Sequence, residues 1–266
     1  MVRACFASAA RFCFEDRFRD RLKSSPQASL RRRGCGQRLT ENQTMGTLYL
    51  VRHGQASFGA DNYDVLSPLG HRQAERLGQY LKERGIDFEA AITGTLQRQR
   101  QTHAGICRGL GRDVPALELP ALNEYDSHAL IEAMHPQTLS KPDTPELYRQ
   151  HFRLLRQSLQ AWIAGQIAPR GMPSYGQWCQ GIEAALDHVR QRHQGAVLLV
   201  SSGGPIATAV GQVIDASPTS WIELNLRIRN ASVTQFEFNP KRHSLLTYNT
   251  LPHFDAPEYA DWVTYT

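Results

Sequence analysis

Two segments of this sequence contain residue types that could bind and transfer a phosphoryl group. Arg52, His53 and Gly54 directly follow one short apolar run, and residues 201–205 (Ser-Ser-Gly-Gly-Pro) directly follow another. An imidazole can attack phosphorus when its other ring nitrogen donates a hydrogen bond to a main-chain carbonyl, because that contact fixes the tautomer. The adjacent arginine offers a planar fork for phosphoryl oxygens, and the glycines let the backbone approach a ligand closely. The pattern therefore favours phosphoryl transfer with His53 as the nucleophile.

The elements around these segments are expected to bring both to one edge of a sheet. The hydrophobic pattern predicts strands at 48–51, 90–92, 114–119 and 196–200, helices from Ser67-Pro68 to Gly85, at 96–110, 145–165 and 178–189 and from Gly203 to Val213, and a hairpin of 231–238 with 243–249. This alternation indicates a three-layer α/β/α fold with a mostly parallel central sheet. Ligands of such sheets bind beyond the carboxyl ends of the strands, where both segments lie. A helical insertion at about 127–170 is expected to cover the site.

The positive charge of the chain is concentrated in its first 44 residues. They hold ten Lys and Arg against four Asp and Glu, whereas the rest of the chain holds 20 against 21. We interpret 1–44 as a basic extension that is disordered or absent from the mature protein, and 45–266 as the folded domain. The extension is either a leader or a segment upstream of a true start at Met45. Its acidic residues favour the second reading, because transit peptides are poor in acids.

Composition argues against several functional classes. Residues 45–266 show no basic stripe with interleaved aromatics, so nucleic-acid binding is not expected. No apolar run approaches the roughly 18–20 residues of a membrane span, so no membrane partner is expected either. The five cysteines form no CxxC pair and show no metal-ligand spacing. Free thiols indicate a reducing compartment, and a cytoplasmic location is therefore expected. The pattern makes no prediction of oligomeric state.

Several motifs resemble those of one family. Residues 50–55 (Leu-Val-Arg-His-Gly-Gln) resemble the signature of the histidine phosphatase superfamily, in its phosphoglycerate mutase-like branch. Similar motifs follow in the family's order: Ser67-Pro68-Leu69-Gly70 with Gln73-Ala74, residues 96–102 (Leu-Gln-Arg-Gln-Arg-Gln-Thr), Leu122-Asn123-Glu124, and residues 200–204 (Val-Ser-Ser-Gly-Gly). The resemblance extends over most of 47–238, and motifs in this order are highly specific.

The resemblance implies a metal-independent phosphatase that needs no cofactor and acts on a phosphorylated small molecule. His53 would accept the phosphoryl group, Arg52 and Arg98 would bind its oxygens, and Glu124 would protonate the leaving group. Ser202 and Gly203 would complete the phosphate site, and the mouth of the pocket would be formed by Gly54, Gln55, Ser57 and Phe58. Water would then hydrolyse the phosphohistidine. Arginines would supply the charge stabilisation that a metal supplies elsewhere.

Ser202 departs from the family pattern, which has a second histidine at this position. A charge-assisted hydrogen bond is worth about 1.5–3 kcal/mol, so its loss would slow the reaction roughly 10- to 200-fold. Two alternatives therefore stay open: a phosphate-binding or regulatory protein with weak or no turnover, and a phosphomutase. His128 and His135 are candidates to replace the absent imidazole.

Some assignments have competitors nearby in the sequence. Arg100 lies two residues beyond Arg98 in the same predicted helix, and Glu118 and Asp126 compete with Glu124. His103 is expected to be an ordinary histidine.

Overall fold

A computed structural model describes residues 45–57, 64–136 and 144–265. Their elements, in chain order, are β1 (Gly46–Arg52), α1 (Pro68–Glu83), β2 (Phe88–Thr93), α2 (Gln97–Leu110), β3 (Ala116–Glu118), η1 (Pro120–Leu122), α3 (Ser127–Met134), α4 (Pro145–Ile163), α5 (Tyr175–Arg192), β4 (Ala196–Ser201), α6 (Gly203–Val213), α7 (Ser220–Asn225), β5 (Val233–Asn239), β6 (Arg242–Thr250), η2 (Pro252–Phe254) and η3 (Pro257–Trp262). The expected basic extension at 1–44 and Phe58 lie outside the described residues.

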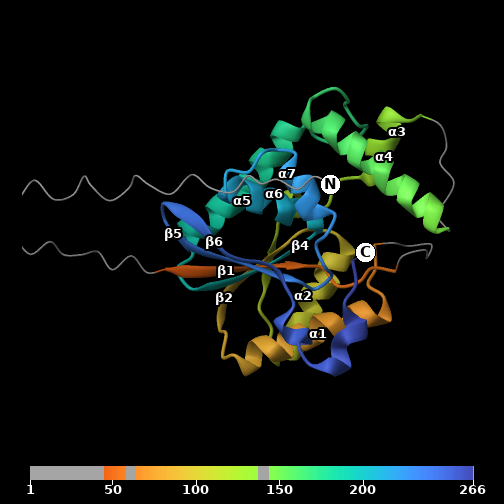
Figure 1. The fold of residues 1–266 in the computed structure, drawn as a ribbon. Helices are drawn as coiled ribbons and strands as arrows, with labels where there is room; N and C mark the ends of the chain where they lie inside the picture. Colours follow the sequence, from red (N-terminus) through yellow and green to blue (C-terminus); the bar gives the residue numbers. More distant parts are fainter. Residues whose placement is uncertain (1–44, 58–63, 137–143, 266) are drawn as a thin grey trace, which may run out of the picture. The chain divides into compact units, whose positions relative to one another are not determined.

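The strands of the described residues form a single mixed sheet in the order β3-β2-β4-β1-β5-β6 (Figure 1). β4 pairs in parallel with β1 and β2, and β3 pairs in parallel with β2, whereas β5 is antiparallel to both β1 and β6. The two central strands end side by side, with Arg52 opposite Ser201. The predicted α/β fold with a mostly parallel sheet is confirmed.

Helices cover both faces of the sheet. Successive side chains of a strand point to opposite faces, so Leu48 and Leu50 pack with the core under α3 to α7, whereas Tyr49 and Val51 pack with α1 and α2. Figure 1 shows α1 and α2 on one side of the sheet and α5, α6 and α7 on the other. The predicted helical insertion corresponds to α3 and α4, which add their apolar side chains to the larger core.

Local sequence explains where the elements begin and end. The Ser67 hydroxyl accepts a hydrogen bond from Gly70 N, and Pro68 occupies the first turn, as expected for the start of α1. Gly85, at φ +66°, follows the end of that helix. β3 is shorter than the predicted strand at 114–119, because Pro115 and Pro120 cannot donate to a ladder.

Residues 251–265 form η2 and η3, for which the hydrophobic pattern made no prediction. This C-terminal segment packs its own small cluster of aromatic side chains against α1. Across the described ranges, no helix has both the length and the apolar character needed to cross a bilayer.

Candidate active site

His53 lies directly after β1 and is buried. Its main-chain N–H donates to Ser201 O at 2.9 Å, which joins the ends of β1 and β4 beside it. Nδ1 of the ring lies 2.7 Å from Gly54 O, and Arg98 Nε–H donates to Nε2 at 3.2 Å. A guanidinium cannot accept a hydrogen bond, so Nε2 must carry the lone pair and Nδ1 the proton. This arrangement gives a neutral imidazole with a defined tautomer.

The surroundings of His53 favour that neutral form. Burial, followed by the charges of Arg98 and Arg52, holds the pKa of His53 well below its ordinary value, against the opposing effect of the Gly54 carbonyl. The ring therefore keeps its lone pair at neutral pH.

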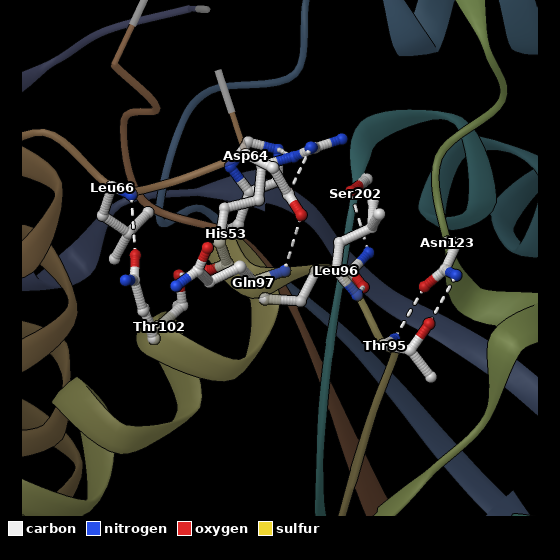
Figure 2. Close-up of polar contacts among 12 residues, drawn as sticks. His53, Asp64, Leu66, Thr95, Leu96, Gln97, Thr102, Asn123 and Ser202 are labelled. Atoms are coloured by element: carbon white, nitrogen blue, oxygen red, sulfur yellow. Dashed lines mark hydrogen bonds and ion pairs between the residues drawn. The ribbon is translucent and has the colours of Figure 1, made fainter. Parts of the chain in front are cut away.

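Arg98 enters the site from the first turn of α2 and is almost completely buried. Its Nη1 forms an ion pair with Asp64 Oδ1 at 2.8 Å. The second oxygen of Asp64 accepts from Gln97 N at 2.9 Å, so this carboxylate also lies at the N-terminus of the helix (Figure 2). The contacts of Nε with His53 and of Nη1 with Asp64 fix the plane of the guanidinium.

Arg52 is the last residue of β1, and its guanidinium is held by main-chain carbonyls. Nη1 donates to Ile228 O at 2.5 Å and to Tyr265 O at 3.0 Å. Asn230 N donates to Thr264 O at 2.9 Å, which ties the end of the described chain to the same region. The C-terminal segment is thus part of the surroundings of Arg52.

Glu124 approaches the N-terminus of α6. Both carboxylate oxygens accept from Gly204 N, at 3.1 and 3.2 Å. A Cβ atom on Gly204 would lie 2.2 Å from Glu124 Oε1, so only glycine permits this contact. Burial raises the pKa of Glu124, although the Gly204 N–H and the charges of Arg98 and Arg52 act in the opposite direction. The carboxyl group is therefore biased toward its protonated form.

Ser202 follows β4 and is fully buried. Its Oγ accepts a hydrogen bond from Gln99 Nε2 at 2.9 Å, a contact drawn in Figure 2. Although Ser202 is the N-cap residue of α6, its hydroxyl makes no capping hydrogen bond there. Next to it, a Cβ on Gly203 would lie 2.5 Å from Asn225 Oδ1, so a larger residue would not fit.

The residues after His53 are held against α1 and α2. Gly54 N donates to Thr102 Oγ1 at 3.0 Å, and Gln55 N donates to Gln73 Oε1 at 2.7 Å. The Gln55 side chain accepts from the Ser67 hydroxyl at 2.7 Å. Ser57 N donates to Val65 O at 2.9 Å.

The residues that competed with Arg98 and Glu124 in the sequence have other partners in the structure. Arg100 and Glu118 form an ion pair with each other on the surface, at 2.5 Å. Asp126 caps α3 by accepting from two of its first main-chain amides. His103 on α2 contacts Val114 O at 2.9 Å, as expected for an ordinary histidine.

The two histidines expected as substitutes are both on α3 or at its end. The His128 side chain is 89% exposed and lies 3.9 Å from Glu132. His135 is the C-cap residue of the same helix. Within the described part of the chain, neither has a hydrogen bond with His53, Arg98 or Ser202, and no group of three His, Cys, Asp or Glu residues is suited to hold a metal ion.

Three buried or partly buried contacts were missed by the sequence interpretation: those of Asp64, Gln99 and Gln73. Buried residues of α2 recur at 98, 99, 102, 105, 106, 107, 109 and 110. Gln99 lies on the same face of α2 as Ile106, and extending this buried face to the first turn of the helix would have predicted that Gln99 is buried. Asp64 has no comparable signal in the sequence.

Comparisons with known proteins match most of the chain. Residues 48–251 match the family model described as the histidine phosphatase superfamily (branch 1). A "probable phosphoglycerate mutase GpmB" of Escherichia coli O139:H28 is 27% identical over 222 residues, which is 79% of this chain and 95% of that protein. A 2,3-bisphosphoglycerate-dependent phosphoglycerate mutase of Chelativorans sp. is 41% identical over 90 residues, but the match spans only 43% of its length.

Solved structures share the fold at low sequence identity. The phosphoserine phosphatase of Entamoeba histolytica, in complex with 3-phosphoglyceric acid, gives a TM-score of 0.56 at 18% identity and covers 78% of this chain and 98% of its own. The phosphoglycerate mutase of Bacillus anthracis gives a TM-score of 0.57 at 18% identity, and the match covers 79% of this chain and 96% of that structure. The neighbours include both a phosphatase and a mutase.

Proposed function

The chain belongs to branch 1 of the histidine phosphatase superfamily, and from this we propose that it hydrolyses phosphomonoesters through a phosphohistidine at His53. The observation that carries the proposal is the tautomer of His53. Nδ1 is tied to Gly54 O, and the lone pair of Nε2 faces the Arg98 guanidinium, where a phosphoryl group would be bound. The nucleophile and a phosphate-binding cation are therefore already in contact.

The reaction has two steps. In the first, Nε2 of His53 attacks phosphorus, the ester P–O bond breaks, and Glu124 gives its proton to the leaving oxygen. In the second, water attacks the phosphohistidine while the Glu124 carboxylate accepts a proton from it, and the N–P bond breaks with return of the electron pair to Nε2. Arg52 and Arg98 stabilise the charge on the phosphoryl oxygens in both steps, and the N-terminus of α6 at Gly203 adds main-chain dipoles.

The pH dependence of kcat/KM follows from the two shifted groups. Below the lowered pKa of His53, protonation removes the lone pair and the rate falls. Above the raised pKa of Glu124, the acid is lost and the rate falls again. We expect Glu124→Gln to abolish the alkaline limb and to leave the acidic limb in place.

A second candidate function is phosphate binding with slow turnover. The observation in its favour is Ser202, a neutral side chain where the family resemblance predicts a charged one. A mutase is less well supported, because it depends on efficient return of the phosphoryl group to a second hydroxyl. The named relatives point to a phosphorylated small molecule as the substrate, since they include a phosphoserine phosphatase and phosphoglycerate mutases.

The proposal is tested by trapping the intermediate. The full chain is incubated with p-nitrophenyl phosphate in EDTA, quenched in base, and analysed for an acid-labile phosphoryl group. We expect the label on His53 and its absence in His53→Ala, whose turnover should fall by about 10³-fold or more. The matched control is His128→Ala, an exposed histidine that should leave both unchanged.

Three results would contradict this mechanism: turnover without a labelled intermediate in rapid quench, a label that persists in His53→Ala, or complete loss of turnover in EDTA. Comparing phosphate release with the formation of positional isomers from 3-phosphoglycerate then separates a hydrolase from a mutase.

A further inference from the structure

The carboxamide of Gln99 has a fixed orientation inside the molecule. Its Oε1 accepts from Leu96 N at 3.2 Å, and its Nε2 donates to Leu122 O at 2.9 Å. A main-chain N–H can only donate and a carbonyl can only accept, so the two ends of the amide cannot be exchanged. The remaining hydrogen on Nε2 points to Ser202 Oγ, at 2.9 Å.

This contact decides how the Ser202 hydroxyl is oriented. Because its oxygen accepts from Gln99, its single proton must point away from the amide. Within the described residues, the structure gives no acceptor for that proton. Ser202 directly follows Ser201, which pairs with Arg52 across the sheet and accepts a hydrogen bond from His53 N. The main chain of Ser202 therefore lies at the strand ends, next to the residue whose carbonyl accepts from His53 N.

Gln99 also fills the space next to Ser202. Both side chains are fully buried. A Cβ atom on Gly94 would lie 2.0 Å from Gln99 Oε1, which shows how closely the amide is enclosed. An imidazole at position 202 would have to compete with this carboxamide for room.

We propose that Gln99 is a positioning residue of this site: it fills the volume beside residue 202 and turns the Ser202 proton toward the phosphoryl group, so that the pair forms a neutral substitute for the second histidine. Consecutive residues of α2 then organise the two strand ends, Arg98 at His53 and Gln99 at Ser202. This role rests on the proposed function. It also gives a physical reason why, among the described residues, neither His128 nor His135 has a hydrogen bond with Ser202, because no second imidazole is required.

A double-mutant cycle tests the orientation of the hydroxyl. Gln99→Met retains most of the volume and removes the amide, and Ser202→Ala removes the hydroxyl. Turnover of p-nitrophenyl phosphate and melting temperature are measured for both single variants, the double variant and the unmodified chain. We expect Gln99→Met to lower kcat/KM by about 2- to 10-fold when Ser202 is present, and by less than about twofold in the Ser202→Ala background. Equal losses in both backgrounds would reveal a purely structural role and overturn the proposal.

A second pair of variants tests whether Gln99 occupies the space that an imidazole at position 202 would need. Ser202→His alone should lower turnover, because Gln99 occupies the position of the ring. Gln99→Ala with Ser202→His should exceed both Ser202→His and Gln99→Ala in kcat/KM. If Ser202→His equals or exceeds the unmodified chain while Gln99 is present, Gln99 does not exclude the imidazole and the inference is wrong.

The phosphohistidine assay separates this inference from the proposed function. A chain that never forms phosphohistidine at His53 overturns the proposed function, and the role of Gln99 with it. A chain that forms the intermediate but shows no coupling between positions 99 and 202 overturns the role of Gln99 alone.

Discussion

The two arginines beside His53 are held by different regions of the molecule. Arg98 is anchored by charged and ring partners near the start of α2: the Asp64 carboxylate and Nε2 of His53. Arg52 is anchored by neutral main-chain carbonyls, those of Ile228 and Tyr265. The positive charge of Arg98 is therefore partly balanced by a neighbouring carboxylate, whereas these two carbonyl contacts orient Arg52 without neutralising it.

The C-terminal segment is also connected with the loop after His53, through the buried side chain of Gln73. Gln73 Nε2 donates to Trp262 O at 2.7 Å and to Thr264 Oγ1 at 3.1 Å. Its Oε1 accepts from Gln55 N, two residues beyond His53. One amide thus connects the loop after His53 with the last described residues. Arg52, which is proposed to bind phosphate, therefore has a contact with a residue more than 200 positions away in the sequence.

The largest effect that distinguishes the two arginines is expected from lysine substitution. Arg98 uses Nε for His53 and Nη1 for Asp64, and a single ammonium cannot occupy both positions. We expect Arg98→Lys to lower kcat/KM by about 10²- to 10³-fold. Both carbonyl contacts of Arg52 use Nη1, which an ammonium can replace, so Arg52→Lys should cost about tenfold. Steady-state kinetics of the two variants provide the measurement, and equal losses would show that the difference in anchoring has no consequence.

A smaller effect is expected when the C-terminal anchor is removed. A chain that ends at Val263 lacks the Tyr265 carbonyl, together with the Thr264 contacts to Asn230 and Gln73. The lost hydrogen bond to the charged Arg52 is by itself worth about 1.5–3 kcal/mol. We expect kcat/KM to fall about tenfold, which is less than the loss expected for Arg98→Lys, with little change in the contact between Arg98 and His53.

Tyr265→Ala is the matched control for this truncation. It removes an exposed ring and retains the main-chain carbonyl, so its kinetics should stay within about twofold of the unmodified chain. An unchanged rate in the truncated chain would show that Arg52 is held in place without the Tyr265 carbonyl.

The sequence predicted the strands and helices that carry the site more completely than the contacts that hold it. Apolar runs and the Ser67-Pro68 helix start are local signals, and the structure has both. The burial of Gln99 was hidden because residues 97–101 are all polar, which usually indicates an exposed face. The contact between Tyr265 and Arg52 uses a main-chain carbonyl, and no residue type specifies such a partner. Motifs and hydrophobic periodicity therefore could not predict contacts in which a backbone group holds a side chain that is distant in the sequence.

The smallest effect concerns the carboxylate on Arg98. The Asp64 side chain is 37% exposed, so the ion pair is partly screened by solvent and contributes only about 0.2–1 kcal/mol. Asp64→Asn retains an oxygen that can accept from Arg98 and removes the negative charge that a bound phosphate would meet. We expect inorganic phosphate to bind about 2- to 5-fold more tightly, because a like charge has been removed from the same guanidinium.

Turnover in Asp64→Asn should change in the opposite direction. Asp64 also accepts from Gln97 N, and an asparagine that keeps its oxygen on Arg98 directs an amide N–H at this main-chain donor. The guanidinium then loses part of its fixed orientation, and kcat should fall by about twofold while phosphate inhibition strengthens. Calorimetry measures the affinity for inorganic phosphate at low and high salt, and steady-state kinetics measure kcat. The gain in phosphate affinity should become smaller at high salt, because salt screens the charge of Asp64. Weaker phosphate binding in Asp64→Asn would contradict this expectation. It would mean that Asp64 acts by holding Arg98 in place and that its negative charge does not oppose phosphate binding. The two arginines would then differ only in the chemical type of the groups that anchor them.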